Sequence, residues 1–225
     1  MICLVTDRRR LAGAAADPGA AFACVAAQAR YAVEAGIDLI QVREPDLEAG
    51  LLARLVTELL AVTVDSSTRV VVNDRLDVAL ATGAAGVHLR ADSIPVRDAR
   101  RLAPAGFLVG RSVHSAAEAA AAADADYLIA GTVFPSASKP ADAPLLGLEG
   151  LRAIVGAVNR PVLAIGGMAG DRMSAAAAAG AVGFAAIGLF MASHHGVEPA
   201  GCRAAELRQI VKDAHSWFDT PKTTP

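Results

Sequence analysis

Several short apolar runs of the chain end in polar residues that could perform chemistry. Gln41 and Arg43 close one run, and Asn73 closes a second. A third run is followed by Ser112 and His114. A guanidinium binds carboxylates or phosphates, amides and hydroxyls hydrogen-bond to ligands, and an imidazole transfers protons near neutral pH. These residue types predict a site for an anionic small molecule.

His114 has the strongest claim to acid–base chemistry, because it stands just past an apolar run and between two serines. We predict His114 and Ser112 as catalytic residues. A surface histidine at the start of a helix is the simpler interpretation of the same pattern. His88 lies within an apolar run, which favours a hydrogen-bonded interior residue over a catalyst.

Glycines follow two later apolar runs, Gly166 and Gly167 after one and Gly188 after the other. Backbone without side chains lets N–H groups approach an anion, particularly with the N-terminus of a helix behind them. We therefore predict that these glycines bind a phosphate. Glycines that serve only tight turns are the alternative.

The remaining binding candidates also have two interpretations. Arg43 and Gln41 share a face of their run and could hold an anion, or Arg43 could pair with Glu44 or Asp74. Asp74 is expected to cap the following helix, although Asn73 and Asp74 could bind Mg²⁺.

A loop that carries hydroxyls and a cation suits a second anion, although it could also be a plain loop between two prolines. Its candidate residues are Ser136, Ser138 and Lys139.

Eight apolar runs alternate with alanine-rich segments and must position these residues. The runs are continuous rather than alternating, which is typical of parallel strands covered on both faces, and the segments between them favour helices. This order predicts a single (β/α)8 TIM barrel. The alternative, a doubly wound sheet, lacks a glycine-rich fingerprint after the first strand. The predicted strands are Ile2–Thr6, Leu39–Arg43, Val70–Asn73, Gly86–Leu89, Leu108–Ser112, Tyr127–Val133, Val162–Gly166 and Gly183–Ile187.

The predicted barrel comprises residues 1–214, and the polar segment 215–225 is expected to be disordered. The predicted helices include Ala21–Ala35, Leu47–Val62, Ser115–Ala123 and a last helix, Pro199–Asp213. Because catalytic residues of TIM barrels follow the C-terminal ends of strands, the polar residues above are expected to meet at one mouth.

Composition excludes several classes of function. The formal charge is −2, which argues against binding of nucleic acid through phosphate neutralisation. No apolar stretch is suited to span a membrane, and the N-terminal order of apolar and basic residues is the reverse of a secretory signal. Three widely spaced cysteines predict neither a disulfide framework nor a thiolate metal site. We expect a cytoplasmic protein, with a homodimer as the default assembly.

The ordered set of these segments resembles the family of thiamine phosphate synthase and the related TenI-type thiazole tautomerase. The resemblance covers nearly the whole predicted barrel and implies a TIM barrel with a thiazole phosphate as substrate. The motifs are weak singly and specific in their order and spacing. They are LVTDRR, GIDLIQVRE, VVNDRLDVALATGAAGVHL, VGRSVHS, ADYLIAGTVFPSASK, PVLAIGGM and GFAAIGLF.

The synthase joins hydroxymethylpyrimidine diphosphate to thiazole phosphate with Mg²⁺ and releases pyrophosphate. Its pattern places a lysine where this chain has Pro45. It also places a metal-binding aspartate where the chain has Ser93, with Asp92 one residue early. The family residues that the resemblance carries over are Gln41, Arg43, Asn73, Asp74, Ser112 and Lys139, and the hydroxyls of the family's Thr-x-Thr-Lys loop are kept at Ser136 and Ser138.

Loss of one cation and one metal ligand should weaken the expulsion of a diphosphate. The tautomerase has no such leaving group and needs no metal, and His114 matches its SVHS-type histidine. We therefore predict a metal-independent thiazole tautomerase without a cofactor, in which His114 moves the proton.

Two alternatives stay open. The first is the synthase with Mg²⁺ at Asp74, in which Arg90, Arg111 or Arg75 replaces the missing lysine. The second is a non-catalytic barrel that binds thiazole phosphate.

Overall fold

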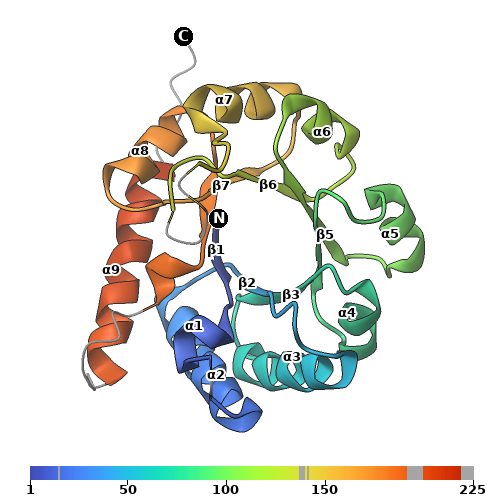
Figure 1. The fold of residues 1–225 in the computed structure, drawn as a ribbon, viewed down its shortest axis with the longest axis vertical. Helices are drawn as coiled ribbons and strands as arrows, with labels where there is room; N and C mark the ends of the chain where they lie inside the picture. The colour runs from blue at the N-terminus through green and yellow to red at the C-terminus, as the bar shows by residue number, and fades with distance from the viewer. Residues whose placement is uncertain (15, 137–139, 141, 192–199, 219–225) are drawn as a thin grey trace.

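Eight parallel strands close into a barrel in chain order, with β8 paired back to β1. The computed structural model describes residues 1–14, 16–136, 140, 142–191 and 200–218, and only the backbone of residues 200–204 and 206. Figure 1 shows the strands as a ring surrounded by helices. The predicted single (β/α)8 TIM barrel is confirmed.

All eight strands lie where the apolar runs predict them, with small differences at their ends. Most of their residues are buried, as expected for parallel strands covered by helices, and β5 is the least buried of the eight. The strands are β1 (Ile2–Val5), β2 (Leu39–Val42), β3 (Arg69–Asn73), β4 (Gly86–Leu89), β5 (Leu108–Val113), β6 (Tyr127–Gly131), β7 (Val162–Ile165) and β8 (Gly183–Ala186).

The helices pack their apolar faces against the outside of the barrel. The start of α2 shows the local logic, because Pro18 occupies its first turn and the Asp17 carboxylate accepts hydrogen bonds from two backbone N–H groups. The helices are α1 (Arg8–Ala12), α2 (Pro18–Ala35), α3 (Ala49–Thr63), α4 (Leu76–Thr82), α5 (Val96–Leu102), α6 (Ala116–Ala121), α7 (Gly147–Ala157), α8 (Asp171–Ala178) and α9 (Ala200–Phe218), with a 3₁₀ turn, η1 (Gly188–Phe190).

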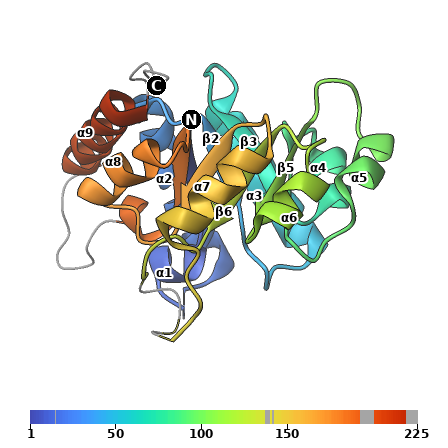
Figure 2. The same cartoon turned by 90° about the horizontal axis from the view of Figure 1, so that it is seen from above.

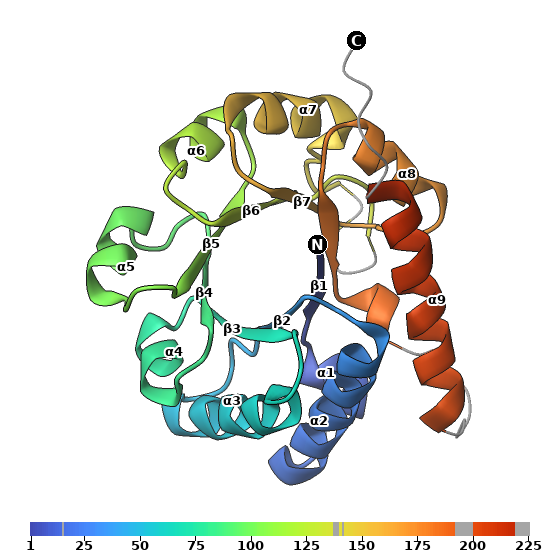
Figure 3. The same ribbon diagram turned by 180° about the vertical axis from the view of Figure 1, so that it is seen from behind.

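The last helix continues past Asp213, where the prediction ends it. Its last two residues, Trp217 and Phe218, are aromatic, and the ring of Phe218 lies 6.1 Å from that of Phe184. Burial of these aromatic groups extends α9, which lies beside α2 and α8 in Figure 3. Residues 215–218 belong to α9, whereas 219–225, like the predicted start at Pro199, lie outside the described residues.

The interior of the barrel changes in character along its axis. An apolar cluster that includes Cys3, Leu39 and Leu163 fills one part. Toward the C-terminal ends of the strands, polar groups such as Gln41 and His88 point inward. Figure 2 shows α1, which follows β1, at the end of the barrel away from the N-terminus. The polar end is therefore the mouth that TIM barrels use for ligands.

Candidate active site

A pocket of about 830 Å³ occupies the C-terminal mouth of the barrel. This volume is within the range of small-molecule sites. Asp74 is not among its lining residues, and Ser138 and Lys139 lie outside the described residues. The predicted residues that line the pocket are Gln41, Arg43, Asn73, Ser112, His114, Ser136, Gly166, Gly167 and Gly188.

Arg43 extends from the end of β2 into this pocket. Its backbone N–H donates to the Thr6 hydroxyl at 3.0 Å, which fixes the start of the side chain. The guanidinium makes no hydrogen bond or ion pair with any residue that the structure describes. The sequence predicts that Arg43 either binds an anion or pairs with Glu44 or Asp74. Neither ion pair occurs among the described residues, so the charge of Arg43 faces the pocket.

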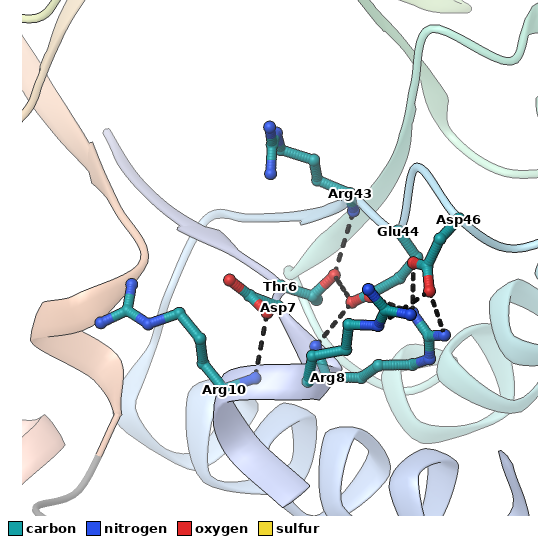
Figure 4. Close-up of polar contacts among 8 residues, drawn as sticks. Thr6, Asp7, Arg8, Arg10, Arg43, Glu44 and Asp46 are labelled. Carbon is teal, nitrogen blue, oxygen red and sulfur yellow. Dashed lines mark hydrogen bonds and ion pairs between the residues drawn. The ribbon is translucent and has the colours of Figure 1, made fainter. Parts of the chain in front are cut away.

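Glu44 instead pairs with Arg8, which comes from the start of α1. The Glu44 carboxylate accepts hydrogen bonds from the Thr6 hydroxyl at 2.7 Å and the Arg8 backbone N–H at 3.0 Å. The Arg8 guanidinium bridges this carboxylate to Asp46, and the Arg43 side chain points away from the cluster (Figure 4). Burial raises the pKa of Glu44, and the hydrogen bonds from Thr6 and Arg8 partly offset this rise. The cluster therefore builds the β1–β2 side of the mouth.

Gln41 and Asn73 form an amide pair on the pocket wall. The Gln41 Nε2 donates to the Asn73 Oδ1 at 2.8 Å. The Gln41 Oε1 is buried and has no hydrogen-bond partner among the described residues. Because a buried acceptor without a partner is unfavourable, this oxygen is suited to accept a hydrogen bond from a ligand.

His88 is a hydrogen-bonded interior residue, as predicted. Its Nε2 lies 2.9 Å from the Ser112 Oγ, and its Nδ1 lies 3.3 Å from the Tyr127 hydroxyl. Burial, together with the positive charge of Arg111, lowers the pKa of His88 to about 3. The imidazole is therefore neutral and reaches the pocket beside Ser112.

His114 lies at the rim of the pocket and its side chain is 59% exposed. The backbone N–H of His114 donates to the Glu118 carboxylate at 2.8 Å, and the ring Nδ1 is 3.3 Å from the same oxygen. The two predicted catalytic residues thus differ in setting, because Ser112 contacts a buried imidazole and His114 an exposed carboxylate.

Asp74 does not cap α4, whose N-cap is Arg75 without a side-chain hydrogen bond. The carboxylate of Asp74 instead accepts a hydrogen bond from the Ser93 hydroxyl. Asp92 pairs with Arg90 at 2.7 Å, and no cluster of three or more His, Cys, Asp or Glu occurs in the described part of the chain. One carboxylate and one hydroxyl fit Mg²⁺ when substrate phosphates and water supply its remaining ligands.

The structure separates the three arginines that could replace the missing lysine. Arg75 pairs with Asp77 and does not line the pocket. Arg111 donates to backbone carbonyls of the loop after β4, including that of Ala91 at 2.7 Å. Of the three, only Arg90 lines the pocket, where it also pairs with Asp92.

Sequence reasoning missed two further arginines of the pocket, Arg10 and Arg172. Arg10 follows β1, and the rule that strand ends carry the site applies to it as well. Arg172 belongs to α8 and reaches back to donate to the Gly167 carbonyl at 3.1 Å. No local pattern marks Arg172, because only the turn after β7 brings it to the mouth.

Two of the three glycines predicted to bind phosphate have backbones that other residues rarely adopt. Gly166 and Gly167 have φ values of 103° and 62°. A Cβ at Gly167 would lie 2.8 Å from the Arg172 guanidinium, so the absence of a side chain permits this approach. The expected helix N-terminus is not directly behind them, because α8 begins at Asp171 and η1 is a single turn.

The chain is similar to known proteins along most of its length. The family model described as thiamine monophosphate synthase matches residues 5–190. A relative from Methanoregula boonei named thiamine-phosphate synthase is 46% identical over 192 residues, which are 84% of this chain and 87% of the relative. A solved structure named thiamine phosphate pyrophosphorylase, from Pyrococcus furiosus, has a TM-score of 0.73 and 34% identity and covers 95% of this chain and 96% of its own.

These similarities correct the predicted activity. A second relative named thiamine-phosphate synthase, from Methanoculleus marisnigri, is 44% identical over 161 residues, 71% of this chain and 76% of its own. The prediction of a thiazole tautomerase is therefore wrong. It gave decisive weight to the lysine lost at Pro45 and the aspartate lost at Ser93, whereas Arg10, Arg43, Arg90 and Arg172 all line the pocket. Matched by this family model over most of its length, the chain belongs to the thiamine monophosphate synthase family.

Proposed function

We propose that the protein is a thiamine-phosphate synthase, a transferase of thiamine biosynthesis. In this reaction the ring nitrogen of thiazole phosphate forms a bond to the methylene carbon of hydroxymethylpyrimidine diphosphate. The C–O bond to the diphosphate breaks, and pyrophosphate leaves with the electron pair. No proton is transferred, so the reaction gives His114 no acid–base step.

One observation carries the proposal, the four arginines around a pocket large enough for two small substrates. A departing diphosphate concentrates negative charge, and preorganised cations stabilise that charge most effectively in a site shielded from water. The names of the relatives agree with this chemistry.

We assign the diphosphate to the side of the mouth formed by Arg43 and Arg90. Arg43 is positioned by its backbone bond to Thr6 and presents a guanidinium that no described residue neutralises. A guanidinium can bind two phosphate oxygens at once. Lys139, from the part of the loop that lies outside the described residues, is a further predicted contact.

The phosphate of the thiazole substrate is assigned to the opposite side, at Gly166, Gly167 and Gly188. Arg10 lies beside Gly188, where a Cβ would be 3.5 Å from its guanidinium. The exposed backbone of the glycines and this cation both suit a phosphate. Ser136, on the same side of the pocket, is proposed as a hydroxyl contact.

The organic rings would lie between the two anion sites, over the polar wall of the barrel. There Gln41 offers its unpaired Oε1 as an acceptor, and Asn73 holds the Gln41 amide in place. Ser112 offers a hydroxyl beside them. These groups orient a substrate without bearing charge.

Asp74 and Ser93 would hold Mg²⁺, with diphosphate oxygens among its other ligands. When bound, the ion neutralises part of the charge that develops on the departing pyrophosphate. The residues that face it would then include Arg90, which lies 3.8 Å from the Asp74 carboxylate.

The test is an assay with purified protein, both substrates and Mg²⁺. Thiamine phosphate and pyrophosphate should appear in equal amounts, and a chelator should stop their formation. Arg30→Gln, an exposed position on α2, serves as a control variant that should match the wild type. Binding of thiazole phosphate without turnover would instead support the non-catalytic alternative.

Two expectations remain predictions beside this function. No helix among the described residues is long and apolar enough to cross a membrane. A cytoplasmic location and a homodimer are still to be measured, the latter by sedimentation of the purified protein.

A further inference from the structure

Three neighbouring strands hold a hydrogen-bonded chain that leads from the barrel interior to the pocket. In the strand register, His88 of β4 is paired with Gly110 of β5, and Gly110 is paired with Tyr127 of β6. His88 and Tyr127 therefore flank a strand position that has no side chain. Ser112, two residues further along β5, lies on the same face as Gly110.

Gly110 makes the contact between the outer two residues possible. A Cβ at this position would lie 2.6 Å from the His88 Nδ1 and 2.5 Å from the Tyr127 hydroxyl oxygen. Real Cβ atoms do not approach other atoms so closely, so any larger residue would push the two rings apart. The phenol crosses the gap and comes within 3.3 Å of the imidazole.

The Tyr127 hydroxyl fixes which nitrogen of His88 carries the hydrogen. Tyr127 is 1% exposed, and His88 is the only hydrogen-bond partner of its hydroxyl among the described residues. A hydrogen on Nδ1 would leave the buried phenol hydrogen without an acceptor, which is unfavourable. The phenol therefore donates to a bare Nδ1, and the hydrogen of the neutral ring sits on Nε2.

The same logic fixes the direction of the next hydrogen bond. With its hydrogen on Nε2, His88 donates to the Ser112 Oγ at 2.9 Å. The hydrogen of the serine hydroxyl then cannot point back at His88 and has no acceptor among the described residues. It is left to donate into the pocket that Ser112 lines.

We propose that His88 is a positioning residue, held in its Nε2–H tautomer by Tyr127, that commits the Ser112 hydroxyl to donate a hydrogen bond to the bound substrate. The acceptor on the substrate is a ring nitrogen or a phosphate oxygen, since both present lone pairs. The proposal deepens the proposed function and rests on it for the identity of the substrate, but the tautomer itself does not depend on it.

The tautomer can be measured without any activity. Imidazole nitrogens with and without hydrogen have distinct ¹⁵N chemical shifts, and His88→Gln identifies the signals of His88 among the five histidines. We expect a bare Nδ1 and a protonated Nε2 in the wild type, and a mixture of tautomers in Tyr127→Phe. An Nδ1–H tautomer in the wild type, or a single Nε2–H tautomer that persists in Tyr127→Phe, would overturn the proposal.

A double-mutant cycle tests the consequence for catalysis. Tyr127→Phe should lower kcat/KM about 3- to 10-fold, as expected for one hydrogen bond, when Ser112 is present. In a Ser112→Ala background it should change kcat/KM less than about twofold. An equal loss in both backgrounds means that the phenol only supports the fold, and it refutes the proposal. The substrate whose KM changes, either hydroxymethylpyrimidine diphosphate or thiazole phosphate, is the one that carries the acceptor.

Tyr31→Phe, the other tyrosine of the chain, is the matched control and should leave both measurements unchanged. Thermal unfolding of each variant shows whether it is folded. If the wild type lacks synthase activity but has the expected tautomers, the proposed function fails and the positioning of Ser112 stands. If it is active with the opposite tautomer, the positioning fails alone.

Discussion

Replacement of Arg43 by glutamine separates a binding role from a structural role more cleanly than any other change at the mouth. The guanidinium makes no hydrogen bond or ion pair with the described residues, and only the backbone N–H of Arg43 bonds to Thr6. Glutamine keeps that backbone bond and removes the charge. We therefore expect Arg43→Gln to fold normally and to lose activity.

The size of the loss follows from the contact that Arg43 is proposed to make. A hydrogen bond to a charged group contributes roughly 1.5–3 kcal/mol, so loss of one such bond should reduce kcat/KM about 10- to 150-fold. A distant guanidinium that acted only through its screened field would contribute less than about 1 kcal/mol, or roughly fivefold. Stability should change by less than about 0.5 kcal/mol, which is about 2 °C in Tm for a chain of this size.

Steady-state release of pyrophosphate, with each substrate varied in turn, measures this effect, and calorimetry measures Tm. The loss should appear when hydroxymethylpyrimidine diphosphate is varied and be restored in part by Arg43→Lys, which keeps the charge. Arg30→Gln should be unchanged in both assays. A loss of kcat/KM of about fivefold or less, or a Tm lowered as much as in Arg8→Gln, would refute the reasoning.

Three further predictions concern the groups around the pocket. Arg8→Gln removes the cation that faces the buried Glu44 and should cost about 3 kcal/mol of stability by denaturant unfolding. Burial raises the pKa of Glu44 and Arg8 acts against that rise, so the pKa should rise further in Arg8→Gln, and the deficit should shrink at pH 5 and grow at pH 8. The pKa of His88 is lowered to about 3, so the wild type should lose about 1.4 kcal/mol of unfolding free energy per pH unit as the pH falls from the ordinary pKa of histidine to about 3. His88→Gln should lack this part of the acid sensitivity. Ser93→Asp adds a second carboxylate beside Asp74, so activity should reach half its maximum at several-fold lower Mg²⁺, whereas an unchanged Mg²⁺ requirement would place the ion elsewhere.

The fold could be predicted from the sequence because its signals are local. Continuous apolar runs such as Val70–Asn73 are buried on both faces only in a sheet that helices cover, and the alternating helix formers supply that cover. The end of α9 could not be predicted in this way. The segment reads as polar, and only the packing of Phe218 near Phe184 shows why the helix continues.

The site was predicted residue by residue along strand ends, and nine predicted residues do line one pocket. The activity was misjudged because charge at the mouth is a sum over strands that are distant in sequence. Pro45 marks a lost cation two residues after Arg43, and Arg90, which follows β4, is only one of three candidate replacements in the sequence. No sequence pattern shows that Arg172 of α8 faces the same space.

The sequence by itself determined the barrel, its eight strands and the end of the barrel where the pocket lies, because continuous apolar runs and the order of elements are properties of the chain read in one dimension. Only the tertiary structure decided which charges are neutralised within the protein and which face a ligand. Arg8 and Arg43 are both arginines at the ends of adjacent strands, yet one is bound to Glu44 and the other is not. That difference depends on distances of a few ångströms between side chains that follow β1 and β2, which only the folded structure sets.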